Sequence, residues 1–128
     1  MMKIKDTKIL VVDDDPFILD MYVMKFKEQG FQIETAMDGK TALEKIEIVK
    51  PDIVLLDVVM PKIDGFDVIK KIKENKTPRT FKILFLTNFG QKEDVERGME
   101  LGADGYIIKA HFTPSEVAAK VKELLEIS

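Results

Sequence analysis

Four short apolar runs in this chain each stop at a polar residue. The runs are rich in Val, Ile and Leu and do not alternate with polar residues, which is typical of strands buried on both faces of a parallel sheet. In an open α/β sheet, ligands bind in the crevice outside the carboxyl ends of the strands. The runs and the residues that follow them are 9–12 with Asp13 and Asp14, 53–56 with Asp57, 83–86 with Thr87, and 106–108 with Lys109. We therefore expect three carboxylates, a hydroxyl and an ammonium group at one edge of the sheet.

The composition is that of one globular domain. The 128 residues are 45% hydrophobic and 34% charged, which is ordinary for a folded domain. The net charge of −3 and the lack of a dense Lys/Arg cluster argue against nucleic acid as a partner. Cysteine is absent, which excludes a disulfide framework and a thiolate metal site. No stretch approaches the ~18–20 apolar residues that span a bilayer, and the first residues lack the apolar segment of a signal peptide. We therefore expect a cytoplasmic protein without membrane contact.

Segments of helical period separate the strand runs, as in repeated βα units. The first helix is predicted to begin after the N-cap Asp15 and to end at Gly30. Its inward-facing residues are predicted to be Ile18, Met21, Tyr22 and Phe26. Residues 31–36 alternate only weakly, which predicts a strand near the sheet edge.

The later helices have start signals of the same kind. They are predicted to begin at residues 38–39, at Asp64, at about residue 91 and at Thr113. The helix over residues 91–101 is polar, with Val95 and Met99 as its main apolar anchors. The last helix opens on a capping-box pattern of Thr113, Pro114 and Glu116. We therefore expect a single domain over residues 1–128, with five strands and five helices and no effector domain.

The carboxylates at the strand ends predict a cation site. Asp13, Asp14 and Asp57 would repel one another if held close, and their hard oxygen ligands suit Mg²⁺. A solvated turn that caps a helix explains Asp15 fully, but it does not explain why Asp57 shares the same edge of the sheet.

Asp57 is the candidate nucleophile, because a carboxylate can attack phosphorus to form an aspartyl phosphate. Mg²⁺, Lys109 and the Thr87 hydroxyl could stabilise the charge that builds up on such a group. A threonine or a lysine at a strand end is common by itself, and only their joint placement with Asp57 indicates a site.

At these residues the chain resembles the receiver domain of bacterial two-component response regulators, over essentially its whole length. The motifs that carry the resemblance are residues 9–16, residues 56–61 with Asp64 and Gly65, residues 84–87, residues 102–106 and Lys109. The resemblance implies a doubly wound, flavodoxin-like α/β fold, with a five-stranded parallel sheet in the order 2-1-3-4-5 and five helices.

The resemblance also implies a role for each site residue. Asp57 would be the phosphoacceptor, and Asp14 would bind Mg²⁺ directly, with Asp13 acting largely through water and the Val59 backbone carbonyl completing the protein ligands. Thr87 would bind the phosphoryl group and Lys109 would pair with it, while Tyr106 would be the switch aromatic. The positions concerned are Asp13, Asp14, Asp57, Val59, Thr87, Tyr106 and Lys109.

Two residues depart from the family pattern, and two more flank the site. Ala110 stands where the family usually has a proline after the lysine, often with a cis bond. A non-proline cis bond costs ~3–4 kcal/mol, which leaves the isomer of this bond open. Asn88 is larger than the small residue that usually follows the switch threonine, and Phe89, with Val59, would flank the approach of a hydrolytic water. Because both flanking residues are apolar, we expect a long-lived phosphorylated state.

The favoured function is a phosphorylation-activated signalling switch. The resemblance implies a histidine kinase or a histidine phosphotransfer protein as donor. Output would come from a protein target on the face of the fourth helix, fifth strand and fifth helix, or from a phosphorelay. Such a protein catalyses only its own phosphoryl transfer and dephosphorylation.

The runner-up is a Mg²⁺-dependent phosphohydrolase with an aspartate nucleophile. Enzymes of that kind carry two aspartates spaced by one residue and then a threonine. Asp13 and Asp15 have that spacing, but Phe17 stands in the threonine position. A nucleotide or flavin site is disfavoured, because no glycine-rich loop follows any predicted strand.

Overall fold

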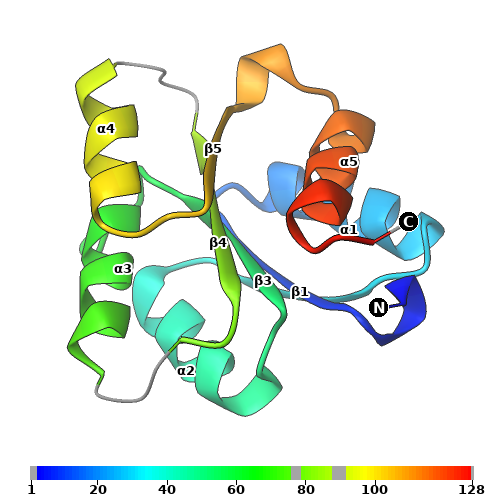
Figure 1. The fold of residues 1–128 in the computed structure, drawn as a ribbon, viewed down its shortest axis with the longest axis horizontal. Helices are drawn as coiled ribbons and strands as arrows, with labels where there is room; N and C mark the ends of the chain where they lie inside the picture. The colour runs from blue at the N-terminus through cyan, green and yellow to red at the C-terminus, as the bar shows by residue number, and fades with distance from the viewer. Residues whose placement is uncertain (1–2, 76–78, 88–91, 128) are drawn as a thin grey trace.

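The computed structural model describes residues 3–75, 79–87 and 92–127, which form an open α/β sheet covered by helices on both faces (Figure 1). All strand pairs are parallel, and the order is β2-β1-β3-β4-β5, as the resemblance implied. The weakly alternating strand lies at one edge, as predicted. The strands are β1 (Lys8–Val12), β2 (Gln32–Ala36), β3 (Ile53–Asp57), β4 (Lys82–Thr87) and β5 (Gly105–Ile108).

The helices begin where the capping residues predict. The side chains of Asp15, Asp38, Asp64 and Thr113 each accept a hydrogen bond from a backbone N–H in the first helical turn. Within the described residues, no helix is long and apolar enough to cross a bilayer. The α-helices are α1 (Pro16–Glu28), α2 (Gly39–Val49), α3 (Gly65–Glu74), α4 (Lys92–Glu100) and α5 (Pro114–Leu124), and two short 3₁₀ helices are η1 (Ile4–Asp6) and η2 (Lys109–His111).

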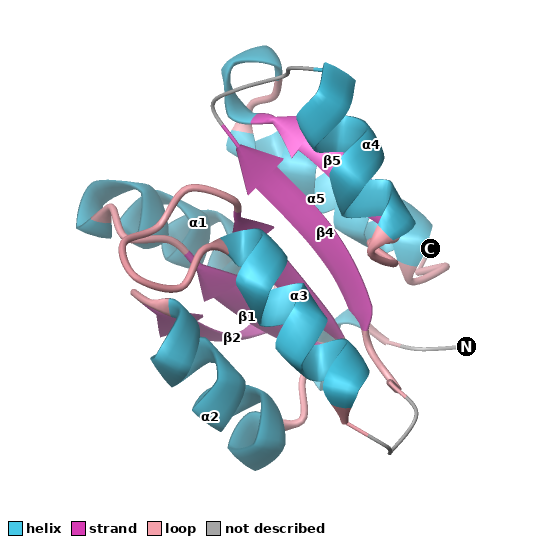
Figure 2. Cartoon of the chain, turned by 90° about the vertical axis from the view of Figure 1, so that its left-hand side faces the viewer, coloured by secondary structure: helices cyan, strands magenta, loops and turns pink. Residues whose placement is uncertain are grey.

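The sheet divides the core into two apolar clusters. Successive strand residues point to opposite faces, so Ile9 and Leu10 of β1 enter different clusters. One cluster contains residues of α1 and α5, and the other contains residues of α2 and α3. Figure 2 shows α2, α3 and α4 on the same side of the sheet, with α1 and α5 behind it. Because β1, β3 and β4 are buried on both faces, their carboxyl ends are fixed in place by packing on both sides.

The inward face of α1 differs from the prediction at one residue. Tyr22 and Phe26 are buried, as predicted, and Ile18 is half-buried. Met21 is 43% exposed, and Leu19 takes the buried position instead. The prediction failed because Leu19 and Tyr22 face the sheet in this turn of the helix, whereas Met21 faces solvent.

Helix α4 rests on the sheet through a glycine rather than through its predicted apolar anchors. Met99 is 44% exposed and Val95 is half-buried, so Met99 as an anchor was wrong. Gly98 is the buried residue of this helix, and a Cβ atom built on it would lie 3.0 Å from the Phe85 ring. The absence of a side chain at Gly98 therefore brings the helix close to the aromatic face of β4.

Candidate functional site

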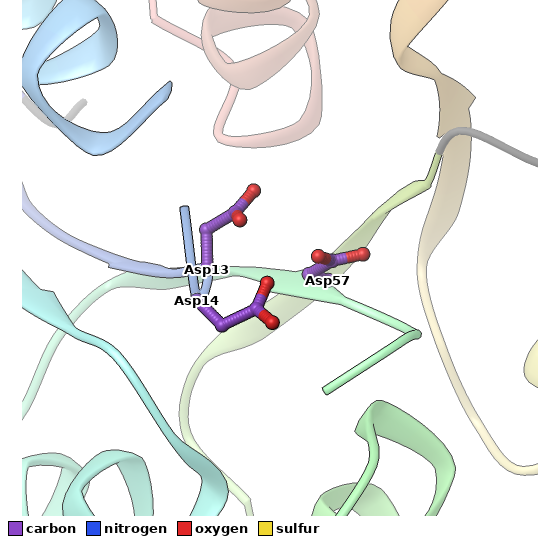
Figure 3. A group of neighbouring side chains, drawn as sticks. All are labelled: Asp13, Asp14 and Asp57. Carbon is purple, nitrogen blue, oxygen red and sulfur yellow. The ribbon is translucent and has the colours of Figure 1, made fainter. Parts of the chain in front are cut away.

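Asp13, Asp14 and Asp57 converge at the carboxyl edge of the sheet. Asp13 follows β1 directly, and Asp57 is the last residue of the neighbouring strand β3, in which Leu56 is paired with Val12. One carboxylate oxygen from each aspartate lies within 4.8 Å of the others. Figure 3 shows the three side chains gathered at this edge of the sheet. The sequence predicted this convergence.

Lys109, which follows the edge strand β5, completes the cluster. Its ammonium group contacts the Asp13 carboxylate and lies 3.5 Å from Oδ2 of Asp57. Its side chain is only 8% exposed, so the two ion pairs are shielded from solvent. The predicted meeting of Lys109 with the aspartates is therefore observed.

Burial makes the Asp57 carboxylate costly to ionise. The residue is 6% exposed, and its pKa is raised from 3.8 to about 6, chiefly by desolvation. Lys109 acts in the opposite direction and lowers the pKa, while the neighbouring Asp13 and Asp14 raise it. Asp14 is exposed, so the cluster is open to solvent on that side, where a cavity of about 190 Å³ lies against it.

Two backbone amides orient the buried carboxylates. The N–H of Asp15 donates to Oδ1 of Asp13 at 2.9 Å, and the N–H of Val59 donates to Oδ1 of Asp57 at 3.3 Å. Asp15 also caps α1 by accepting from the N–H of Phe17, which is the role predicted for it. The remaining carboxylate oxygens face Lys109 and the cavity.

Gly65 is a structural residue of the site that the sequence analysis named only as part of a family motif. A Cβ atom built at this position would lie 2.4 Å from the Asp57 carbonyl oxygen. The N–H of Gly65 also donates to the Val58 carbonyl at 2.9 Å. Helix α3 therefore begins directly against the backbone of Asp57, which a larger residue at its start would prevent. The close approach itself requires the three-dimensional structure.

Thr87 and Tyr106 lie next to each other beside the cluster. Thr87 ends β4 and is 1% exposed, and the hydroxyl oxygen of Tyr106 is buried. Burial raises the pKa of Tyr106, and an interaction with the Thr87 side chain lowers it. The Tyr106 ring packs against Phe85 with its centroid 5.8 Å away. The Tyr106 side chain therefore lies inward in this structure, with its hydroxyl oxygen buried and without a hydrogen-bond partner among the described residues.

The peptide bond before Ala110 is trans, since the described residues contain no cis bond. The chain continues from Lys109 into the 3₁₀ helix η2 instead. The isomer that the sequence left open is thereby settled. The predicted effects of Asn88 and Phe89 fall on residues outside those that the structure describes. Val59, the other flanking residue, is 55% exposed beside the cavity.

The donor set fits a hard divalent cation. Three carboxylates within 4.8 Å of one another supply oxygen ligands, and one ammonium group leaves two of their negative charges unbalanced. A cation that enters from the side of Asp14 would meet ionisable oxygen atoms without displacing apolar side chains. The cluster can therefore hold a metal ion.

Fold and site together define a class of protein: a flavodoxin-like domain with an acidic cluster and a lysine at the carboxyl ends of its strands. The sequence comparison gives the family. Residues 9–122 match the response regulator receiver domain, and the chain belongs to that family.

Curated relatives include bacterial transcriptional regulators. The chain is 44% identical over 121 residues to the alkaline phosphatase synthesis transcriptional regulatory protein PhoP of Bacillus subtilis, covering 94% of this chain and 49% of that protein. It is 36% identical over 118 residues to the phosphate regulon transcriptional regulatory protein PhoB of Escherichia coli, covering 92% of this chain and 51% of PhoB. The chain thus spans about half the length of these relatives.

Solved structures include proteins of the same size. Chemotaxis protein CheY4 of Vibrio cholerae superposes with a TM-score of 0.85 at 30% identity, covering 92% of this chain and 98% of that one. The BeF3-activated receiver domain of DrrB, from Thermotoga maritima, has a TM-score of 0.81 at 35% identity, covering 94% and 97%. The fold of the receiver family is therefore present over nearly the whole chain.

The raised pKa of Asp57 predicts that Asp57→Asn stabilises the metal-free protein. An aspartate whose pKa is raised by folding costs the folded state stability above that pKa, and the cost fades as the pH falls towards 3.8. In EDTA at pH 8 the variant should therefore melt at a higher temperature than the wild type, and the difference should shrink below pH 6 and vanish near pH 3.8.

The matched control is Asp20→Asn, which removes an exposed carboxylate from α1 and should leave the melting temperature nearly unchanged. If Asp57→Asn melts no higher than the wild type at pH 8, desolvation of Asp57 does not dominate the site. Melting curves by circular dichroism across this pH range make the comparison.

Proposed function

We propose that this protein is a phosphorylation-activated switch in which Asp57 accepts the phosphoryl group. The observation that carries the proposal is the position of its carboxylate: buried at a strand end, 3.5 Å from an ammonium group and within 4.8 Å of two further carboxylates. Membership of the receiver family supports the same role.

The metal in this proposal is Mg²⁺. Asp14 would bind it directly, Asp57 and the Val59 carbonyl would add protein oxygens, and Asp13 would hold it largely through water. Bound there, Mg²⁺ supplies charge neutralisation and orients the phosphoryl oxygens. The fit of three clustered carboxylates to a hard cation supports this assignment.

The proposed transfer forms one bond and breaks another. A carboxylate oxygen of Asp57 attacks phosphorus, the new O–P bond forms, and the N–P bond of a phosphohistidine breaks, with the electron pair leaving on the imidazole nitrogen. The Lys109 ammonium, already 3.5 Å from Oδ2 of Asp57, stabilises the negative charge on the phosphoryl group. The Thr87 hydroxyl donates a hydrogen bond to a phosphoryl oxygen.

The switch in this proposal links Thr87 to Tyr106. A phosphoryl oxygen that draws Thr87 towards the site favours the inward Tyr106 ring, which packs under α4 against Phe85. The phosphoryl group acts by its differential affinity for two states of the face formed by α4, β5 and α5. Because the Tyr106 hydroxyl is already buried in the unmodified chain, phosphorylation would increase the population of an arrangement that this chain can adopt by itself.

The proposed partners are proteins. A sensor histidine kinase or a histidine phosphotransfer protein donates the phosphoryl group, and a downstream protein reads the face of α4, β5 and α5. In the proposal this chain is not an enzyme for other substrates and catalyses only its own phosphorylation and dephosphorylation. It makes no contact with nucleic acid or membrane in this proposal, and it works in the cytoplasm. Relatives named as transcriptional regulators are about twice as long as this chain, and what they do with nucleic acid is a property of those proteins.

Mg²⁺ should raise the melting temperature of the wild type, because a ligand that binds only the folded state stabilises it by mass action. Titration with millimolar Mg²⁺ should produce this rise, and Asp14→Ala should abolish it. Ca²⁺ is a useful comparison, since it accepts more oxygen ligands at longer distances. An equal rise in wild type and variant would remove Asp14 from the ligand set.

A histidine kinase or a small acyl phosphate with Mg²⁺ should add one phosphoryl group. The product should be labile to alkali and hydroxylamine, and peptide mapping should place the label on Asp57. Asp57→Asn should take up none, whereas Asp20→Asn should behave as wild type. A label on another residue would contradict the assignment, and rapid multiple turnover of a phosphate ester dependent on Asp57 would favour the phosphohydrolase alternative.

Phosphorylation should change amide exchange most over residues 92–112, which contain α4, β5 and η2. Thr87→Ala should take up the phosphoryl group and lose most of this change, because the link to Tyr106 is missing. Exchange measured by mass spectrometry on phosphorylated and unmodified protein tests this expectation. Changes restricted to residues 58–64 would show that the switch does not use Thr87 and Tyr106.

A further inference from the structure

The start of helix α2 lies unusually close to the loop that follows Asp57, the β3–α3 loop (residues 58–64). A Cβ atom built on Gly39, the first residue of α2, would lie 2.8 Å from Cγ2, 2.9 Å from Cβ and 3.0 Å from the carbonyl oxygen of Ile63. Carbon atoms in good contact are ~3.5–4.0 Å apart. These Ile63 atoms belong to the backbone and to the branched root of the side chain, so they cannot swing away as the end of a flexible side chain could.

The requirement for glycine at this position is a matter of space and not of backbone conformation. The glycines with positive φ among the described residues are Gly30 and Gly102, so the backbone of Gly39 would accept an alanine. At a compatible position, replacing glycine with alanine normally stabilises a protein, because the unfolded chain loses entropy. The contact with Ile63 predicts the opposite sign here.

The loop that Gly39 contacts connects the parts of the acidic site. Its first residues are Val58, whose carbonyl accepts from the N–H of Gly65 at 2.9 Å, and Val59, whose N–H donates to Oδ1 of Asp57 at 3.3 Å. Ile63 lies near its other end and donates its N–H to the Pro61 carbonyl at 2.9 Å. Ile63 therefore lies four residues from Val59 in a short loop whose ends are joined by the hydrogen bond from Gly65 to Val58.

We propose that Gly39 is a positioning residue for the metal and phosphoryl site: by admitting Ile63 against the start of α2, it fixes the β3–α3 loop and hence the Val59 carbonyl and the Asp57 carboxylate. This inference rests on the proposed function. It assigns no contact between Gly39 and the metal or the phosphoryl group, and the effect passes through Ile63. Partners that orient metal ligands typically change metal affinity about 10–100-fold when they are altered.

The test compares Mg²⁺ affinity in Gly39→Ala and wild type, by titrating Mg²⁺ and following amide chemical shifts of the folded protein. Gly39→Ala should bind Mg²⁺ about ten-fold more weakly, in line with the loss of a ligand-orienting contact. Under a fixed sub-saturating Mg²⁺ concentration it should also take up a phosphoryl group from an acyl phosphate more slowly. A purely structural role would lower the melting temperature in EDTA and leave the affinity of the folded protein unchanged.

Rescue and control variants identify the contact. Ile63→Gly removes both the Cγ2 and the Cβ atoms that lie nearest to the built Cβ and leaves only the carbonyl oxygen at 3.0 Å. The double variant Gly39→Ala/Ile63→Gly should therefore bind Mg²⁺ more tightly than Gly39→Ala alone. Lys40→Ala, at the next and exposed position of α2, should bind as wild type. Ile63→Ala alone should loosen the loop and weaken binding less than Gly39→Ala does, which provides a test even if Gly39→Ala fails to fold.

Wild-type affinity in Gly39→Ala would overturn the proposal, and so would failure of Ile63→Gly to improve binding in the double variant. If Gly39→Ala does not fold, wild-type affinity in Ile63→Ala would overturn it. These results would leave the proposed function standing, because the wild type would still bind Mg²⁺ and accept the phosphoryl group. Failure of the wild type to bind Mg²⁺ at all would overturn both.

Discussion

Two buried carboxylates, those of Asp13 and Asp57, share one ammonium group, that of Lys109. Removing charges from water is expensive. The Lys109 ammonium offsets part of this cost by lowering the pKa of Asp57, whereas burial and the neighbouring Asp13 raise it. With Asp14 at the solvent side, the described residues of the cluster leave two negative charges unbalanced. The strand ends thus carry an excess of negative charge. A divalent cation would neutralise this excess, whereas a phosphoryl group alone would increase it. In the proposed function the cation would therefore bind before the phosphoryl group arrives.

The fold could be predicted from the sequence because each element carries its own signal. Unbroken apolar runs marked the doubly buried strands, and Asp15, Asp64 and Thr113 marked helix starts that the structure confirms. The meeting of the aspartates with Lys109 followed from one rule about parallel sheets, since residues at the carboxyl ends of neighbouring strands must share an edge. The assigned chemical roles of these residues remain predictions.

What could not be predicted were the contacts between elements that no local pattern encodes. Periodicity gave α4 an apolar face containing Met99, but the helix packs through Gly98, because an aromatic ring of β4 occupies the space that a side chain would fill. The same applies to Gly39 and Gly65, which look like turn residues in the sequence. In the structure each one leaves room for a neighbouring residue: the side chain and carbonyl oxygen of Ile63 in one case, and the backbone of Asp57 in the other. When a glycine is needed because of the space it leaves, the sequence does not reveal this need until the neighbouring residue in the structure is known.

The contact between α4 and the rest of the molecule has a kinetic consequence. Gly98 meets the rings of Phe85 and Tyr106 with a bare backbone, and Arg97 lies over the Phe66 ring at 4.5 Å from its centroid. Helices that interlock by large side chains must unpack and change rotamers before they can shift, because packed cores are dense. Gly98 is the one buried residue of α4 (Lys92–Glu100), so a movement of this helix over the Phe85 and Tyr106 rings would repack no fully buried side chain of its own. We therefore expect such a movement to need less repacking than that of a helix held by large interlocking side chains.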